Sequence, residues 1–183
     1  MAGDMRVTGF AGLSGVGKTT LIERLIPALR AQGQRVSVVK HAHHGPDVDH
    51  PGKDSFRHRE AGAFEVVVAS SRRLVLMREF ECEVALTVHQ MLAELSPVAD
   101  WVLVDGFRDA DIPKLELWRQ QPGGLALYPL DPFVVAVVTD DPAKLPEPTG
   151  LPVLDINDPQ AVVAWMQAHA HRFDYRFPEP DAV

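Results

Sequence analysis

The sequence has one cysteine, Cys82, so an intramolecular disulfide and a cysteine-rich zinc or iron–sulfur site are excluded. It also lacks any apolar run that approaches the roughly 20 residues of a membrane-spanning helix. At the N-terminus no apolar run follows a basic segment, so we do not expect a signal peptide. These absences predict a soluble, cytoplasmic protein with no membrane partner.

Positive charge is scarcer than negative charge. The chain has 18 lysines and arginines against 25 aspartates and glutamates, which gives a net charge of −7. This balance provides no general attraction to nucleic acid, so we do not expect nucleic acid as a partner. The 183 residues match the usual length of one domain, and the apolar fraction of 46% is ordinary for a globular protein. We expect residues 1–176 to form that domain and residues 177–183 to be a mobile tail.

The chain does contain an alternation of strand-length apolar runs with helical patterns. The apolar runs lie at residues 36–39, 64–69, 74–77, 101–104, 115–118 and 133–138. The helical patterns cover about 18–32, 54–61, 83–95 and 159–171. Several runs are continuous rather than alternating, which is typical of strands covered on both faces. This order predicts an α/β sandwich with a mainly parallel sheet.

A segment rich in turn-forming residues interrupts this alternation. Residues 120–124 contain proline and two glycines, and they separate the apolar stretches 114–118 and 125–130. Two apolar stretches on either side of such a turn predict a β-hairpin. We therefore expect a hairpin at about 114–130, appended to the main sheet.

The strongest motif lies near the N-terminus, where residues 12–19 fit the pattern G-x-x-x-x-G-K-[ST]. A strand-like run precedes the motif and a helical pattern follows it, as a phosphate-binding P-loop requires. Glycines in such a loop let the backbone amides approach an anion closely, and the helix N-terminus adds to the positive potential. The expected nucleotide-binding residues of the loop are Gly12, Ser14, Gly15, Val16, Gly17, Lys18, Thr19 and Thr20. The motif predicts a nucleoside triphosphate as ligand, with Lys18 at the outer phosphates and the Thr19 hydroxyl on magnesium. The fold class then becomes the three-layer sandwich of P-loop nucleotide hydrolases.

Three acids are candidates for holding that magnesium ion. Asp105 ends the apolar stretch 101–104, which is the form of a Walker B segment. Asp47 and Asp49 lie in a polar loop after the run 36–39, at the end of a strand where open α/β sheets bind ligands. We expect Lys18, Asp49 and Asp105 to be the catalytic groups and Thr19, Asp47, Asp49 and Asp105 the metal ligands.

The same loop is rich in histidine, with His41, His43 and His44 close together. Imidazoles and carboxylates suit zinc or nickel, so a dedicated metal site is one reading. A nucleotide-facing switch loop is a second, and a solvated loop is a third. Because the loop follows a strand close to the P-loop, we favour the nucleotide-facing reading.

Two residues at later strand ends are candidates for contacting the nucleotide base. Asp140 follows the run 133–138, and Asn157 follows a short apolar stretch at 152–156. An aspartate in this position accepts hydrogen bonds from guanine that adenine cannot donate. The motif N-K-x-D, usual in guanine-specific GTPases, is absent. A role for either residue in a turn or helix cap is equally compatible with the pattern.

Taken together, these segments resemble the MobB family, the molybdopterin-guanine dinucleotide biosynthesis protein B. The similarity extends from Arg6 to about Gln167. It is carried by the P-loop and by Val39-Lys40-His41-Ala42-His43-His44, Asp47-Val48-Asp49, Pro51-Gly52-Lys53-Asp54-Ser55, Arg57-His58, Ala61-Gly62-Ala63, Val68-Ala69-Ser70, Val104-Asp105-Gly106-Phe107, Ile112-Pro113-Lys114 and Leu154-Asp155-Ile156-Asn157-Asp158. The stretch of histidine, aspartate and Pro-Gly-Lys-Asp-Ser is far more specific than a P-loop alone.

The resemblance implies a homodimeric protein that binds GTP and Mg²⁺, hydrolyses GTP slowly and acts in molybdenum cofactor biosynthesis. Its implied partner is the guanylyltransferase MobA, with molybdopterin or molybdoenzymes as further candidates. The family usually has glutamate at the position of Asp105, so the shorter side chain would reach magnesium through water. In the family the sheet is extended between subunits, and we expect the hairpin at 114–130 to make that contact.

Three other functions remain open from the sequence. A non-catalytic adaptor would use the nucleotide only to set its shape. A small-molecule kinase would use the same phosphate cradle and would need Arg57, Arg59 or Arg108 over the transferred phosphate. A metallochaperone-type GTPase would bind metal through His41, His43 and His44. Slow hydrolysis would suit an adaptor better than either a kinase or a metabolic enzyme, so we favour a GTPase that acts as an adaptor.

Overall fold

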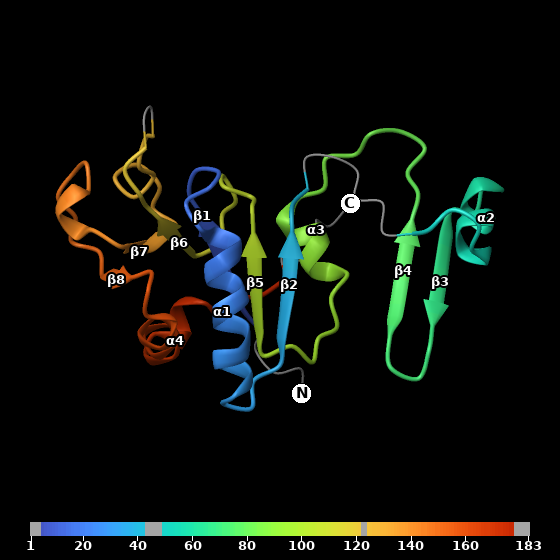
Figure 1. Ribbon diagram of the computed structural model, residues 1–183, viewed down its shortest axis with the longest axis horizontal. Helices are drawn as coiled ribbons and strands as arrows, with labels where there is room; N and C mark the ends of the chain where they lie inside the picture. Colours follow the sequence, from blue (N-terminus) through green and yellow to red (C-terminus); the bar gives the residue numbers. More distant parts are fainter. Residues whose placement is uncertain (1–4, 43–48, 122–123, 178–183) are drawn as a thin grey trace. The chain divides into compact units, whose positions relative to one another are not determined.

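A computed structural model of the chain describes residues 5–42, 49–121 and 124–177. By its internal contacts the chain divides into two compact units. Unit 1 comprises residues 1–41 and 87–183, and unit 2 comprises residues 42–86. Unit 2 is therefore inserted into the sequence of unit 1, between β2 and α3 (Figure 1). The expected domain of residues 1–176 spans all of unit 2 and most of unit 1, and of the expected tail only Phe177 is among the described residues.

Unit 1 contains the predicted parallel sheet, which confirms the α/β fold class. Its six strands follow the order β2-β5-β1-β6-β7-β8, and every neighbouring pair is parallel. They are β1 (Arg6–Ala11), β2 (Val36–Lys40), β5 (Trp101–Asp105), β6 (Lys114–Leu117), β7 (Val134–Thr139) and β8 (Val153–Asp155). The helices of this unit are α1 (Lys18–Arg30), α3 (Val88–Ala93) and α4 (Pro159–Ala168), with short 3₁₀ turns at Pro142–Lys144 and Ala170–Arg172.

Both faces of the sheet are apolar, which produces the three layers. Along β5, Trp101 and Leu103 belong to one buried cluster, and Val102 and Val104 belong to a second. The first cluster includes the buried side chains of α1 and α4, and the second includes Val88 and Leu92 of α3. Because side chains alternate along a strand, a continuous apolar run can supply both clusters at once.

Helices α3 and α4 are shorter than the patterns at 83–95 and 159–171. The first turn of α3 is fixed by Thr87, whose hydroxyl accepts from the backbone amide of Gln90, while the Gln90 side chain accepts from the amide of Thr87. This reciprocal capping box starts the helix at Val88, five residues later than predicted. Within the described residues, no helix is long and apolar enough to cross a membrane.

The prediction of a hairpin at 114–130 is wrong. Strand β6 lies between β1 and β7 and pairs with both in parallel, and residues 124–130 include no strand. The buried Glu116 side chain explains this difference. Its two carboxylate oxygens accept hydrogen bonds from the backbone amides of Leu127 and Tyr128, each at 2.7 Å. These amides are therefore bound by a side chain and do not pair in a strand ladder.

The appended hairpin is instead in unit 2. Strands β3 (Glu65–Ala69) and β4 (Leu74–Arg78) pair antiparallel, and α2 (Asp54–Glu60) precedes them. Lys53 is the N-cap of α2. The continuous apolar runs of these strands predicted that both faces would be covered. Instead, Val67 is 55% exposed and Leu74 is 67% exposed.

Candidate functional site

The P-loop has the geometry that its sequence predicts, between the end of β1 and the start of α1. Gly12, Gly15 and Gly17 have φ angles of 130°, 81° and 103°, a region that side chains disfavour. At Gly12 a Cβ atom would lie 2.4 Å from the backbone oxygen of Leu117 in β6, so no larger residue fits there. Val16 is buried in the core, which anchors the middle of the loop. Ser14, Gly15, Thr19 and Thr20 are exposed at this end of the sheet.

The Lys18 ammonium group is folded back over the loop. Its Nζ donates to the carbonyl oxygens of Gly12 at 2.9 Å and Leu13 at 2.8 Å. Partial burial lowers the pKa of Lys18, the nearby Asp105 carboxylate opposes this shift, and the Lys40 ammonium adds to it. The Lys18 side chain thus lies among backbone dipoles, in the place where a P-loop lysine meets phosphate oxygens.

Thr19 and Asp105 form a polar pair of the kind that could hold a magnesium ion. The Thr19 hydroxyl donates to Asp105 Oδ2 at 3.0 Å, although 86 residues separate them in sequence. Asp105 is 3% exposed, and its other oxygen, Oδ1, is buried and has no hydrogen-bond partner among the residues that the structure describes. A buried carboxylate oxygen beside a hydroxyl group fits a hydrated magnesium ion, which prefers hard oxygen ligands and keeps several waters.

A residue that the motif analysis did not single out contacts the same carboxylate. Lys40, the last residue of β2, places its Nζ 2.7 Å from Asp105 Oδ2. The parallel pairing of β2 with β5 sets Lys40 directly beside Asp105 in register. No sequence spacing could reveal this contact, because it depends on which strands are neighbours.

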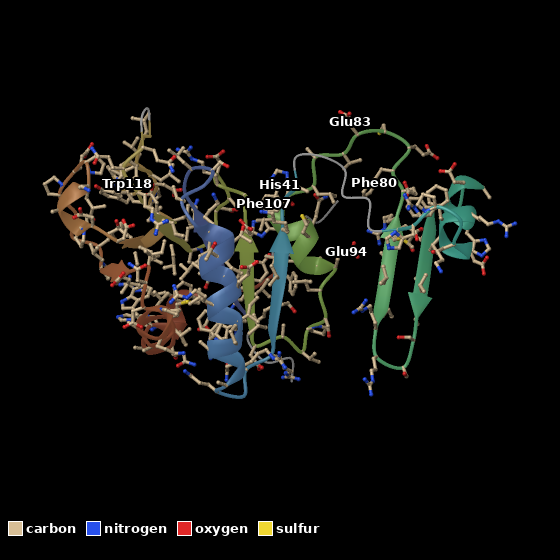
Figure 2. All side chains as sticks on the ribbon, in the orientation of Figure 1. His41, Phe80, Glu83, Glu94, Phe107 and Trp118 are labelled. Carbon is tan, nitrogen blue, oxygen red and sulfur yellow. The ribbon has the colours of Figure 1, made fainter. Side chains whose placement is uncertain are left out.

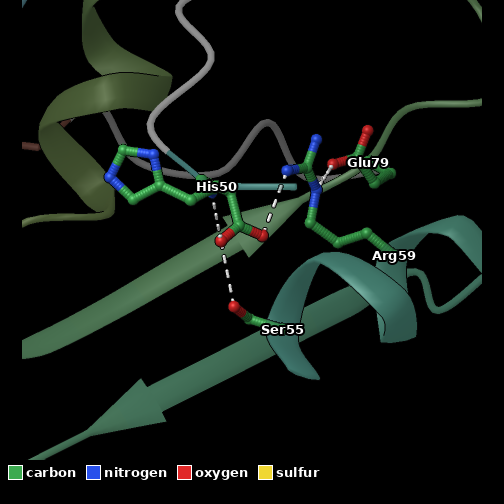
Figure 3. A network of polar contacts seen from close by, with 5 residues as sticks. His50, Ser55, Arg59 and Glu79 are labelled. Carbon is green, nitrogen blue, oxygen red and sulfur yellow. Dashed lines mark hydrogen bonds and ion pairs between the residues drawn. The ribbon is translucent and has the colours of Figure 1, made fainter. Parts of the chain in front are cut away.

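Asp49 has a different environment, within unit 2 (Figure 3). One carboxylate oxygen accepts from the His50 amide and the Ser55 hydroxyl, and the other accepts from Arg59 Nη1 at 3.3 Å. Arg59 also binds Glu79 through Nε. The side chain of Asp49 is 8% exposed, and hydrogen bonding lowers its pKa despite the opposing effect of desolvation. These contacts hold the start of α2 to the residues around it.

The other loop residues give no metal cluster in the described part of the chain. Asp47, His43 and His44 lie outside the described residues. Among residues 5–42, 49–121 and 124–177, no group of three histidine, cysteine or acidic side chains is placed to hold a metal ion. His41 stacks on Phe107, with ring centroids 4.6 Å apart (Figure 2).

The carboxyl ends of β6 and β7 enclose a small polar cavity of about 250 Å³. Asp140 lines it, together with Trp118, Arg119, Gln120 and Thr139. The Asp140 carboxylate pairs with Arg119 Nε at 2.8 Å. A Cβ atom on Gly17 would lie 3.5 Å from Arg119 Nη1, so this arginine connects the cavity to the P-loop. Sequence reasoning missed Arg119, although its place at the end of a central strand was a usable signal.

Asn157 takes the turn role that its sequence left open. Its backbone N–H donates to Asp155 Oδ1 at 2.8 Å, and its side-chain Nδ2 donates to the same oxygen at 3.0 Å. Its carbonyl oxygen accepts from Arg24 Nη2 of α1 at 2.9 Å. Asn157 therefore shapes the loop after β8 and links it to α1.

The fold and the loop geometry together define a P-loop nucleotide-binding protein. The family model "Molybdopterin guanine dinucleotide synthesis protein B", MobB, matches residues 7–140, and the chain belongs to this family. It is 42% identical over 164 residues to the Escherichia coli protein named molybdopterin-guanine dinucleotide biosynthesis adapter protein, covering 86% of this chain and 91% of that relative. A Haemophilus influenzae protein of the same name is 38% identical and is matched over 94% of each chain.

Solved structures agree with this assignment. A MobB homologue from Bacillus stearothermophilus superposes with a TM-score of 0.66 at 25% identity, covering 90% of this chain and 97% of that one. Bacillus subtilis MobB gives a TM-score of 0.66 at 28% identity, covering 88% and 96%. The resemblance drawn from the motifs and the predicted fold class are thereby confirmed.

Proposed function

We propose that this protein binds GTP and Mg²⁺ at the P-loop and acts as a nucleotide-dependent adaptor in the synthesis of molybdopterin guanine dinucleotide. The observation that carries the proposal is the preformed site in which Lys18 folds over the loop and Thr19 meets Asp105. The names of the E. coli and H. influenzae relatives support the pathway and the adaptor role.

Each group has a distinct part in this proposal. The loop amides hold the phosphates, and Lys18 leaves the Gly12 and Leu13 carbonyls to neutralise the outer phosphate oxygens. Thr19 and Asp105 would hold magnesium, which would supply charge neutralisation at the phosphates. Asp49 and Asp47 stay candidates for a contribution from the loop between β2 and α2.

For base recognition we propose Asp140 in the cavity at the ends of β6 and β7. Its carboxylate would accept hydrogen bonds from guanine, which adenine cannot donate. Arg119 holds that carboxylate in the free protein, so guanine would compete with the arginine for it. Slow hydrolysis is consistent with the sequence, because neither residues 12–19 nor residues 105–111 include a glutamine that could orient water.

We propose further that the protein is a cytoplasmic homodimer and that the contact is made by unit 2, not by residues 114–130. Val67 and Leu76 are directly opposite each other in the β3–β4 register, and Leu74 is on the same face. These side chains are 55%, 45% and 67% exposed. The β3–β4 sheet has only two strands, and a two-stranded sheet is marginal on its own. A second copy would cover this apolar face with an equivalent surface.

The adaptor role is tested by the affinity for the guanylyltransferase MobA, measured with GTP, with GDP and without nucleotide. We expect affinity to depend on nucleotide in the wild type and to become independent of it in Lys18→Ala. An affinity for MobA that is independent of nucleotide in both the wild type and Lys18→Ala would refute the nucleotide-dependent part of the role. Phosphoryl transfer to an added acceptor would replace the proposal with a small-molecule kinase.

A further inference from the structure

The Asp105 carboxylate has a lysine ammonium group beside it. Lys40 Nζ lies 2.7 Å from Asp105 Oδ2, the same oxygen that accepts from the Thr19 hydroxyl at 3.0 Å. The ammonium therefore contacts the carboxylate of the magnesium pair directly. A buried carboxylate without a counter-charge would be costly, so this contact stabilises the Asp105 carboxylate.

The two partners of this ion pair are very unequal in exposure. The Asp105 side chain is 5% exposed and is fixed at the end of a central strand, whereas the Lys40 side chain is 58% exposed. A long, exposed lysine side chain can leave the carboxylate for water or for a phosphate at little cost. Asp105 cannot follow, so any new cation at its oxygens must displace Lys40 or share the carboxylate with it.

Displacement of the Lys40 side chain does not require strand β2 to move. The backbone amide of His41 donates to the Asp105 carbonyl oxygen at 3.0 Å, and the His41 ring stacks on Phe107. A Cβ atom on Gly106 would lie 2.8 Å from His41 Cβ, so the backbone after Asp105 is packed closely against this residue. The strand end stays held while the ammonium group is free to turn.

Charge balance indicates why a divalent ion would compete with Lys40. Lys40 contacts Asp105 directly, and the Lys18 ammonium group is close enough to both to interact with them electrostatically. Two ammonium groups and a divalent ion around one carboxylate would repel one another strongly. Triphosphate oxygens, which are anionic, would accept the released ammonium.

We propose that Lys40 is a displaceable counter-cation of Asp105, which neutralises this carboxylate before metal binds and would move to the nucleotide phosphates when a divalent ion takes the carboxylate. This inference rests on the proposed magnesium–nucleotide function and assigns a role to a residue outside the P-loop and Walker B motifs.

The first test is a titration of nucleotide-free protein with Mn²⁺, followed by electron paramagnetic resonance, in the wild type and Lys40→Met. Methionine keeps an unbranched chain of similar length and removes the charge. We expect Lys40→Met to bind Mn²⁺ about fivefold more tightly, the size expected for loss of a partly exposed ion-pair competitor. Arg30→Met is the matched control, because it removes one exposed positive charge from the far end of α1. Equal Mn²⁺ affinity in Lys40→Met and wild type would overturn the inference.

The second test measures GTP affinity in EDTA and in Mg²⁺. We expect Lys40→Met to weaken metal-free GTP binding and to lose much less affinity in Mg²⁺, while Lys40→Arg behaves as the wild type. An equal loss in both conditions would identify Lys40 as a plain phosphate contact and overturn the inference. If wild-type protein binds no GTP, the proposed function fails, whereas the Mn²⁺ titration still tests Lys40. Should Lys40→Met fold poorly, Lys40→Gln provides the same comparison.

Discussion

Replacing Gly12 by alanine should damage the protein much more than replacing Gly15, although both are P-loop glycines with positive φ. At Gly15 an added Cβ has no neighbour within 4 Å, so only the backbone conformation is penalised. That penalty is about 1–2 kcal/mol for a left-handed conformation. At Gly12 the Cβ would also lie 2.4 Å from the Leu117 oxygen, and Leu117 is buried and paired with Val138 of β7. This clash adds about 1–3 kcal/mol, the usual cost of overpacking.

Urea unfolding followed by tryptophan fluorescence measures this difference. All three tryptophans of the chain, Trp101, Trp118 and Trp165, are in unit 1, so the signal reports the unit that carries the P-loop. We expect Gly15→Ala to lose about 1–2 kcal/mol of unfolding free energy, or a few degrees in Tm, and Gly12→Ala about twice as much or more. Equal losses in the two variants would refute the steric argument for Gly12.

Three further predictions concern the edge of the sheet, the hairpin and the base cavity. The hydrogen bonds from Arg35, chiefly those of its side chain, lower the pKa of Asp100 below the ordinary aspartate value of 3.8. The pair therefore stabilises the fold fully at pH values above 3.8, and this stabilisation is lost as the pH falls through the lowered pKa. Asp100→Asn should therefore destabilise the protein at pH 7 and have a smaller effect near pH 3, and thermal melts that show the same loss at both pH values would contradict this. Val67→Asp with Leu76→Asp should shift sedimentation from dimer to monomer without loss of α/β circular dichroism, and an unchanged dimer would place the contact elsewhere. Asp140→Asn should lower GTP affinity about tenfold or more and leave ATP affinity nearly unchanged, because a charged acceptor for guanine is lost; an equal change for both nucleotides would remove Asp140 from base recognition.

Local patterns predicted the P-loop and the end of β5 correctly, because both depend on short stretches of chain. The glycines at 12, 15 and 17 have the positive φ angles that the motif requires, and Asp105 lies beside Thr19. The parallel sheet was also predictable, since continuous apolar runs alternate with amphipathic helices.

Contacts between distant segments were beyond the sequence. Glu116 binds two backbone amides eleven and twelve residues later and so prevents the expected hairpin at 114–130. The apolar runs of β3 and β4 are typical of buried strands, yet several of their side chains are exposed in this chain. An apolar run alone does not reveal whether another surface covers it. The ion pairs of Lys40 and Arg119 were not predicted, because each residue is paired with an acid at the end of a neighbouring strand.

The measurement that tests the central claim most directly is calorimetric titration of GTP, GDP and ATP with magnesium, on the wild type and on Lys18→Ala. Lys18 contacts two loop carbonyls and no core side chain through its ammonium group, so its removal should leave the fold intact. We predict guanine-selective binding in the wild type and its loss in the variant. Tight ATP binding without a response to GTP would contradict the guanine-nucleotide adaptor and favour a kinase.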